Sequence, residues 1–229
     1  MIPTDWLGPQ EWQAVRLSLR VAGVAMLASL PLAVAVAWLL ARRRFPGHGL
    51  LSGIVHLPLG LPPVVTGYLL LLTFGTRGPV GSLLQPLGIV FAFRWTGAAL
   101  AAAIMAFPLM VRALRLGFEA VDPRLEQAAA TLGAPRIWIF LTVTLPLILP
   151  AILAGATLGF AKAVGEFGAT ILFAGNLPGV TQTMPLAIYM GFESGIDRAL
   201  VLSTVLIAIS VIALVSVRLL GATALDRAD

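Results

Sequence analysis

The chain has 229 residues, of which 59% are hydrophobic and 11% are charged, and its mean hydropathy is +0.98. Soluble domains carry about 25% charged residues, so this composition excludes an ordinary soluble protein and predicts one integral membrane domain over residues 1–229. The net charge is +5. Because no basic stripe studded with aromatics accompanies that charge, we expect arginines in membrane-facing loops and no nucleic acid partner. The sequence contains no cysteine, which excludes disulfides and zinc–thiolate sites.

The apolar stretches predict an all-α integral membrane protein, whose transmembrane helices follow in chain order. The N-terminal segment MIPTDWLGPQEW has no basic region before an apolar core, so we expect no cleavable signal peptide. A span needs about 20 apolar residues. Five stretches are candidates, namely residues 17–41, 49–75, 95–111, 137–169 and 199–217.

Two further apolar stretches are interrupted by turn-forming residues. Residues 79–93 are rich in glycine and proline, which predicts an external loop with a brief helix. Residues 168–192 contain GNLPGVTQTMP, which predicts a loop and a short surface helix. The count is therefore five spans, and a sixth span formed by 168–192 is the competing interpretation.

The arginines predict the orientation, because the side that is richer in them faces the cytoplasm. One side holds nine, and the opposite side holds Arg16, Arg20, Arg77, Arg94 and Arg198; the nine are Arg42, Arg43, Arg44, Arg112, Arg115, Arg124, Arg136, Arg218 and Arg227. With five spans, the N-terminus lies outside and the C-terminus lies in the cytoplasm.

Residues 119–136, EAVDPRLEQAAATLGAPR, form a charged island between apolar stretches. Charge is costly in hydrocarbon, so the island lies outside the bilayer. Asp122 is a typical N-cap, Pro123 suits the first helical position, and Gly133 suits a left-handed helix exit. The spacing i, i+3, i+4 and i+7 places one group of residues on a shared helix face, namely Leu125, Ala128, Ala129 and Leu132. We interpret this short capped helix as a docking device for a soluble partner.

Groups for catalysis are scarce. The chain has two histidines, His48 and His56, and neither has the neighbours that a metal site or a nucleophile–base set requires. The one lysine, Lys162, is flanked by alanines, which excludes a phosphate-binding loop. We therefore expect no enzyme, cofactor or metal in this chain, and ATP, if it is used, must be bound by another subunit.

The break in the second stretch is one candidate contact with a solute. Pro58, Pro62 and Pro63 interrupt the helix there. A helix that restarts near mid-membrane directs free N–H groups at the break, an arrangement that binds anions. These would be the N–H groups of Val64, Val65 and Thr66. The alternative interpretation is a proline kink that packs against neighbouring helices.

Lys162 and Glu166 are a second candidate, because they lie one helical turn apart in the fourth stretch. Ionisable residues inside a membrane are often functional, which favours a charged rim on a solute path. The alternative is a structural ion pair, or a lysine that extends to the interface. In the same stretch, the spacing of Gly155 and Gly159 permits close helix packing, either within one subunit or at a dimer seam.

The charged island resembles the EAA loop of bacterial ABC importer permeases. The residues are QAAATLG at 127–133, followed after nine residues by VTLP at 143–146. Gln127 takes the place of the glutamate, with Glu126 just before it, and Val143 takes the place of the isoleucine. The resemblance implies that the residues that couple this chain to an ATPase are Glu126, Gln127, Ala128, Ala129 and Gly133.

Longer blocks are similar to molybdate permease subunits. They are HLPLGLPPVVTGYLLL at 56–71, MAFPLMVRALRLGFEAVDPRLEQAA at 105–129 and AKAVGEFGATILFAGNLPG at 161–179. GEFGA at 165–169 is also found in sulfate/thiosulfate permeases, whereas the first block and residues 176–185 favour molybdate.

The resemblance implies a type I ABC importer fold in the cell inner membrane. It also implies a second, usually identical permease subunit, two ATPase subunits that bind Mg-ATP, and a periplasmic binding protein that delivers the oxyanion. Two alternatives stay open. One is a sulfate, thiosulfate or tungstate importer of the same kind, and the other is a secondary transporter or channel that works alone.

Overall fold

The computed structural model describes residues 7–225, except for the side chains of residues 193, 194 and 217–225. Every regular element in this range is helical, as predicted. Three helices are long and apolar enough to cross a membrane, namely α1 (Pro9–Arg42), α5 (Trp95–Ala120) and α12 (Ile196–Leu225). Two bent helix pairs raise the number to as many as five spans if each pair is one span. The predicted five spans correspond to that upper count; Arg218 and Arg227, used to predict the orientation, lie outside the described side chains.

The first bent pair consists of α2 (His48–Gly60) and α3 (Pro63–Phe74), whose axes differ by 116°. Pro58 lies inside α2, and the helix is interrupted at Leu61 and Pro62. Because Pro62 and Pro63 have no N–H to donate and restrict the residues before them, the chain leaves the helix here and restarts in a new direction. The predicted interruption is confirmed.

The second bent pair begins with α7 (Arg136–Ile139), the π-helical turn η2 (Phe140–Thr144) and α8 (Leu145–Leu147), and continues into α9 (Leu149–Val164) after a bend of 68°. This pair corresponds to the predicted fourth span, 137–169, which the structure bends at Ile148 and ends at Val164. Pro146 and Pro150 flank the bend at Ile148, and neither proline can donate a hydrogen bond across it. Residues 136–147 form a separate arm that accompanies the charged island.

The two interrupted apolar stretches form short helices. Residues 79–93 contain α4 (Gly81–Leu84) and η1 (Gln85–Leu87), as predicted. Residues 168–192 hold α10 (Gly168–Phe173) and the first part of α11 (Met184–Ser194), so no single helix crosses this region of the described chain. The prediction of a surface helix was wrong for α10, because Ala169 and Phe173 are fully buried.

Small residues bring the long helices close together. α1 and α9 both pack against α5, and their buried contact is built largely of alanine, including Ala22, Ala25, Ala98, Ala102 and Ala163. A Cβ added at Gly159 would lie 2.5 Å from the Met110 sulfur, and one at Gly155 would contact Leu114. The glycine pair of α9 therefore faces α5 and serves packing within the subunit.

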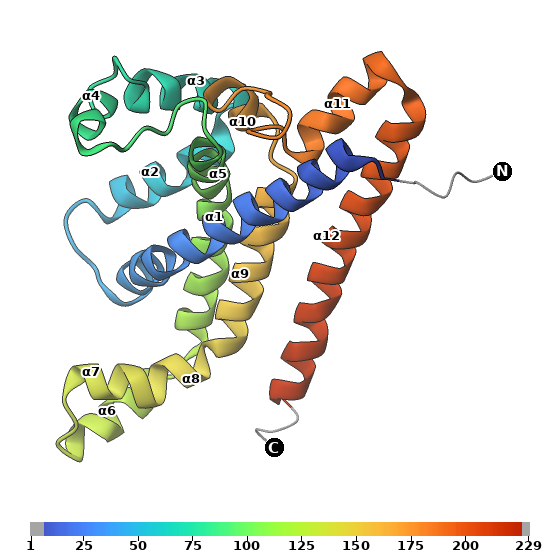
Figure 1. Cartoon of the computed structure of the whole chain (residues 1–229). Coiled ribbons are helices and arrows are strands. Elements are labelled where there is room, and N and C mark those ends of the chain that lie inside the picture. Colours follow the sequence, from blue (N-terminus) through green and yellow to red (C-terminus); the bar gives the residue numbers. More distant parts are fainter. Residues whose placement is uncertain (1–6, 226–229) are drawn as a thin grey trace.

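Figure 1 shows how these helices order the molecule. α5 and α9 run side by side through the centre, and α1 crosses them. α6 (Pro123–Thr131) and α7 lie at one end, whereas α3, α4 and α10 lie at the opposite end. The helix of the charged island, α6, and the helix start after the break, α3, are thus at opposite ends of the molecule.

Gly67 of α3 is required at the contact with α10. A Cβ at this position would lie 2.6 Å from the carbonyl oxygen and 2.8 Å from the Cα of Ala169, so backbone must move. We expect Gly67→Ala to destabilise the protein by about 1–3 kcal/mol, as overpacking does, and to lower the melting temperature in detergent. Gly53→Ala in α2, where nothing lies within 4 Å, is the control. Equal melting temperatures for the two variants would contradict this packing.

Candidate functional site

The helix α6 of the charged island has the predicted ends. The side chain of Asp122 accepts a hydrogen bond from the backbone N–H of Arg124 at 2.9 Å, as an N-cap does. Pro123 is the first helical residue. Gly133 follows the helix with φ +84°, a conformation that glycine adopts without strain.

One face of α6 is open to solvent. No residue of α6 is buried, and Leu132, just after the helix, is 89% exposed. Gln127 and Ala128 are also exposed, and Ala129 is partly exposed. Leu125 is 48% exposed. These leucines and alanines are not covered by other described residues and form a small apolar surface, which is typical of a docking site for another protein.

Glu126 points away from this surface, into the molecule. Its Oε1 lies 3.2 Å from Arg42 Nη2, at the end of α1, and accepts a 2.8 Å hydrogen bond from the hydroxyl of Thr144. Arg42 also donates to the carbonyl oxygen of Val121. Glu126 is therefore engaged in contacts within the chain, whereas its neighbour Gln127 is exposed and lines the groove beside it. Arg42 and Thr144 were missed, because no local signal links residues so far apart in the chain.

A groove adjoins this contact, between the end of α1 and the elements α6, α7 and η2. Its volume is about 1070 Å³. Apolar side chains of α1 and η2 line it, including Val34, Trp38 and Phe140, and so do Arg43 and Arg136. α6 therefore contacts α1 through Glu126 and Arg42, and the groove separates the two helices beside this contact.

Lys162 and Glu166 form the ion pair that their spacing predicts, with 2.7 Å between Nζ and Oε2. The Glu166 side chain is 1% exposed and that of Lys162 is 31% exposed. The second carboxylate oxygen of Glu166 accepts the backbone N–H of Ala169 at 3.0 Å. Glu166 therefore holds the first turn of α10 and carries a buried charge that Lys162 neutralises.

The start of α3 lies beside the start of α10. A Cβ at Gly168 would lie 3.2 Å from the backbone nitrogen of Val64. The N–H of Thr66 donates to the Pro62 carbonyl at 3.1 Å, so the expectation that it is free was wrong. Val64 and Val65 have no backbone acceptor within the described residues, and the Thr66 hydroxyl is buried without a partner there. The structure brings this helix start and Glu166 into one region.

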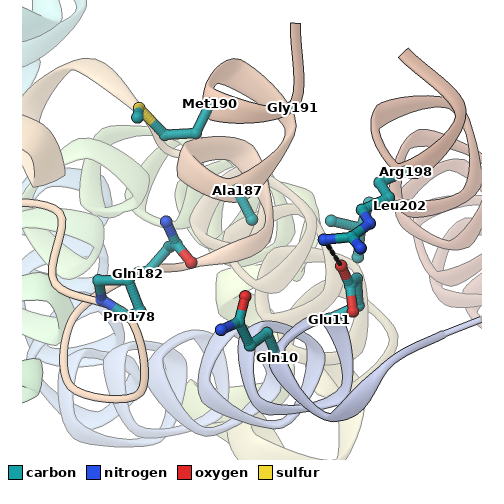
Figure 2. Close-up of a pocket in the computed structure, with 9 residues that line it drawn as sticks. All are labelled: Gln10, Glu11, Pro178, Gln182, Ala187, Met190, Gly191, Arg198 and Leu202. Atoms are coloured by element: carbon teal, nitrogen blue, oxygen red, sulfur yellow. Dashed lines mark ion pairs between the residues drawn. The ribbon is translucent and has the colours of Figure 1, made fainter. Parts of the chain in front are cut away.

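A small polar pocket lies at the end of the molecule that is remote from α6. Figure 2 shows Glu11 and Arg198 facing each other, with Gln10 and Gln182 extending into the same space. The pocket volume is about 120 Å³, and the ion pair measures 3.8 Å. The pocket lies between the start of α1 and the helices α11 and α12. The sequence analysis did not identify it.

The histidines have structural roles. The Nε2 atom of His48 lies 2.9 Å from the carbonyl oxygen of Leu40, and Nδ1 of His56 lies 2.8 Å from that of Ser52. Within residues 7–225, the described side chains contain no cluster of three or more metal-binding residues.

The sequence matches other proteins over most of its length. It is 55% identical over 218 residues, 93% of each chain, to the molybdenum transport system permease protein ModB of Escherichia coli (strain K12). It is 58% identical over 180 residues, covering 78% of this chain and 79% of the other, to the corresponding Haemophilus influenzae protein. It is 36% identical to the sulfate transport system permease protein CysT of Salmonella typhimurium, over 93% of this chain and 77% of that protein.

The fold matches solved transporter structures. A bacterial ABC transporter involved in the import of alginate aligns with a TM-score of 0.73 at 19% identity, over 96% of this chain and 81% of that one. An inward-facing MetNI methionine ABC transporter aligns with a TM-score of 0.67 at 14% identity, over 93% and 94%. The model of the family "binding-protein-dependent transport system inner membrane component" matches residues 29–228. The chain is a member of that family, with the fold of an ABC importer transmembrane domain.

Proposed function

We propose that this chain is the membrane-spanning permease subunit of an ATP-driven molybdate importer. The observation that carries the proposal is the 55% identity to a molybdenum transport permease over 93% of both chains. Similarity to a sulfate permease is lower, at 36%. An importer of sulfate, thiosulfate or tungstate is the alternative.

In this proposal the chain works within a larger assembly. Two copies form the oxyanion pathway, two ATPase subunits bind and hydrolyse Mg-ATP, and a periplasmic binding protein delivers the anion. The N-terminus lies outside and the C-terminus lies in the cytoplasm, so that α6 faces the ATPase. The chain itself catalyses no reaction, needs no metal or other cofactor, and contacts lipid through its exposed apolar faces.

The open face of α6 supports the ATPase contact. Its exposed side chains present apolar area at the end of the molecule remote from α10. Ala128, Ala129 and Gly133 supply this face and its exit turn. Gln127 is exposed beside the groove that it lines together with Glu126, and Glu126 contacts α1. When the ATPases close, α6 moves with them and the spans change from inward-open to outward-open.

The crossing of α3 and α10 supports a place for the anion along the pathway. The N–H groups of Val64 and Val65 begin a helix, where the backbone dipole favours negative charge. The hydroxyl of Thr66 is buried close by without a partner among the described residues. Lys162 adds a positive charge that is partly exposed. A hydrated dianion can pass these groups without being held by a full set of ligands.

The direct test is reconstitution of the chain in liposomes with its ATPase and its binding protein. We expect uptake of labelled molybdate that requires ATP and the binding protein and that a hundredfold excess of sulfate leaves nearly unchanged. Strong competition by sulfate would assign the cargo to the alternative class. Solute movement by the purified chain alone, driven by an ion gradient, would overturn the proposal.

Gly133 provides a test of the exit turn of α6. A valine at φ +84° is strained by roughly 1–2 kcal/mol, which would redirect the end of the helix. We expect Gly133→Val to lower molybdate uptake at least fivefold at normal expression. Gly88→Val is the matched control, because Gly88 has φ +75° and follows η1, which continues from α4, and α4 lies at the opposite end of the molecule (Figure 1). Normal uptake by Gly133→Val would count against this turn as part of the coupling device.

Lys162 and Glu166 allow a pathway role to be separated from a structural one. Lys162→Met leaves the buried carboxylate without its cation, which costs about 3 kcal/mol, so the melting temperature should fall. In Lys162→Met/Glu166→Gln no charge remains, and the glutamine oxygen can still accept the Ala169 N–H. We expect this double variant to regain stability but to keep uptake several-fold below the parent protein. Full recovery of uptake would mean that the pair is structural only.

A further inference from the structure

A single carboxylate oxygen joins three segments at the end of the molecule that carries α6, and Arg42 adds a fourth. Oε1 of Glu126 receives both the guanidinium of Arg42, at 3.2 Å, and the hydroxyl of Thr144, at 2.8 Å. The same Nη2 atom of Arg42 lies 3.2 Å from the carbonyl oxygen of Val121. We call this set the Arg42–Glu126 junction. The Arg42 side chain is 15% exposed and that of Glu126 is 27% exposed, so water competes only partly for these contacts.

Each member of the junction other than Glu126 lies at or next to the end of a long helix or of its connecting arm. Arg42 is the last residue of α1, and Val121 directly follows α5. Thr144 is the last residue of the π-helical turn η2, and the arm continues through the 68° bend into α9. π-Helical turns are rare and often mark functional positions. The junction therefore connects α6 to three helices that form the centre of the fold.

Little else fixes α6 to these helices. No α6 residue is buried, and its side chains make no other hydrogen bond to a separate element among the described residues. The groove of about 1070 Å³ next to the junction leaves space between α6 and α1. Without the junction, α6 would be held mainly by its chain connections and by its packing on the arm, and it could move without moving α1.

We propose that Arg42 is a positioning residue for energy coupling, which acts through Glu126 and Thr144. The junction holds α6 in one position relative to the ends of α1, α5 and the arm of α9. A displacement imposed on the exposed face of α6 is then transmitted to three spans together. In this role Glu126 makes a contact within the chain, and the ATPase binds the exposed apolar face of α6. The inference rests on the proposed function, because it assumes that an ATPase displaces α6.

The test compares ATP hydrolysis with transport in the reconstituted complex. We expect Arg42→Gln to keep the ATPase bound and hydrolysis stimulated by the binding protein, but to raise the ATP hydrolysed per molybdate at least fivefold. Arg42→Lys should lie between this variant and the parent. The double variant Arg42→Glu/Glu126→Arg should recover coupling relative to Arg42→Glu alone, because it restores an ion pair in reverse.

Arg115→Gln is the matched control. Arg115 lies near the C-terminal end of α5, which precedes Val121. It pairs with Glu119 at 2.7 Å in an exposed i, i+4 contact, and the variant removes this pair. Such exposed pairs contribute little, so its ratio of ATP to molybdate should equal that of the parent. Thr144→Val removes one neutral donor while the ion pair is kept. We expect this variant to raise the ATP hydrolysed per molybdate about twofold. It replaces Arg42→Gln in the test if that variant fails to fold.

Two results would overturn the inference. One is a parent-like ratio in both Arg42→Gln and Thr144→Val, at unchanged melting temperature. The other is loss of the ATPase from Glu126→Gln but not from Arg42→Gln during co-purification, which would make Glu126 a direct contact of the ATPase. If the parent complex itself shows no ATP-driven uptake, the proposed function fails, and that outcome is distinct from an effect of these variants.

Discussion

The lack of water in hydrocarbon constrains this fold most, because each backbone N–H and C=O group there needs a partner within the protein. Long helices satisfy that requirement by themselves, and prolines break it. The chain is bent at two places, after Gly60 and at Ile148. α10 packs beside the helix start after the first bend, and the second bend lies between α9 and the arm that packs on α6. The start of α3 and the contact of Glu126 with Thr144 therefore each lie close to a bend in a helix pair.

Close packing of small residues gives these bends fixed positions. Alanines of α1, α5 and α9 form most of the central contact, and glycines allow backbone to meet backbone where α3 crosses α10. Interiors packed in this way transmit a displacement instead of absorbing it. The helices around α5 thus form a stiff body, which is what a permease needs if movement at α6 is to change access at the opposite end.

Charged groups are few, and most of the described ion pairs link two different elements of the structure. The Lys162–Glu166 pair fixes the start of α10, the Glu11–Arg198 pair joins α1 to α12, and Arg42 joins α1 to α6. The Arg42–Glu126 pair gives α6 two different faces. One face is apolar and exposed, and the other carries Glu126 and contacts α1 through Arg42.

The sequence by itself determined the apolar stretches, the helix breaks at prolines and the two ends of α6, since these depend on neighbours a few residues away. It also indicated Glu126, Lys162 and Glu166 as candidate residues, but not Arg42 or Thr144. Only the tertiary structure decided that Glu126 faces inward while Gln127 faces solvent, because Arg42 lies 84 positions from Glu126 along the chain. The bounds of the fourth span and the burial of α10 likewise depended on packing between remote segments, for which a single sequence carries no local signal.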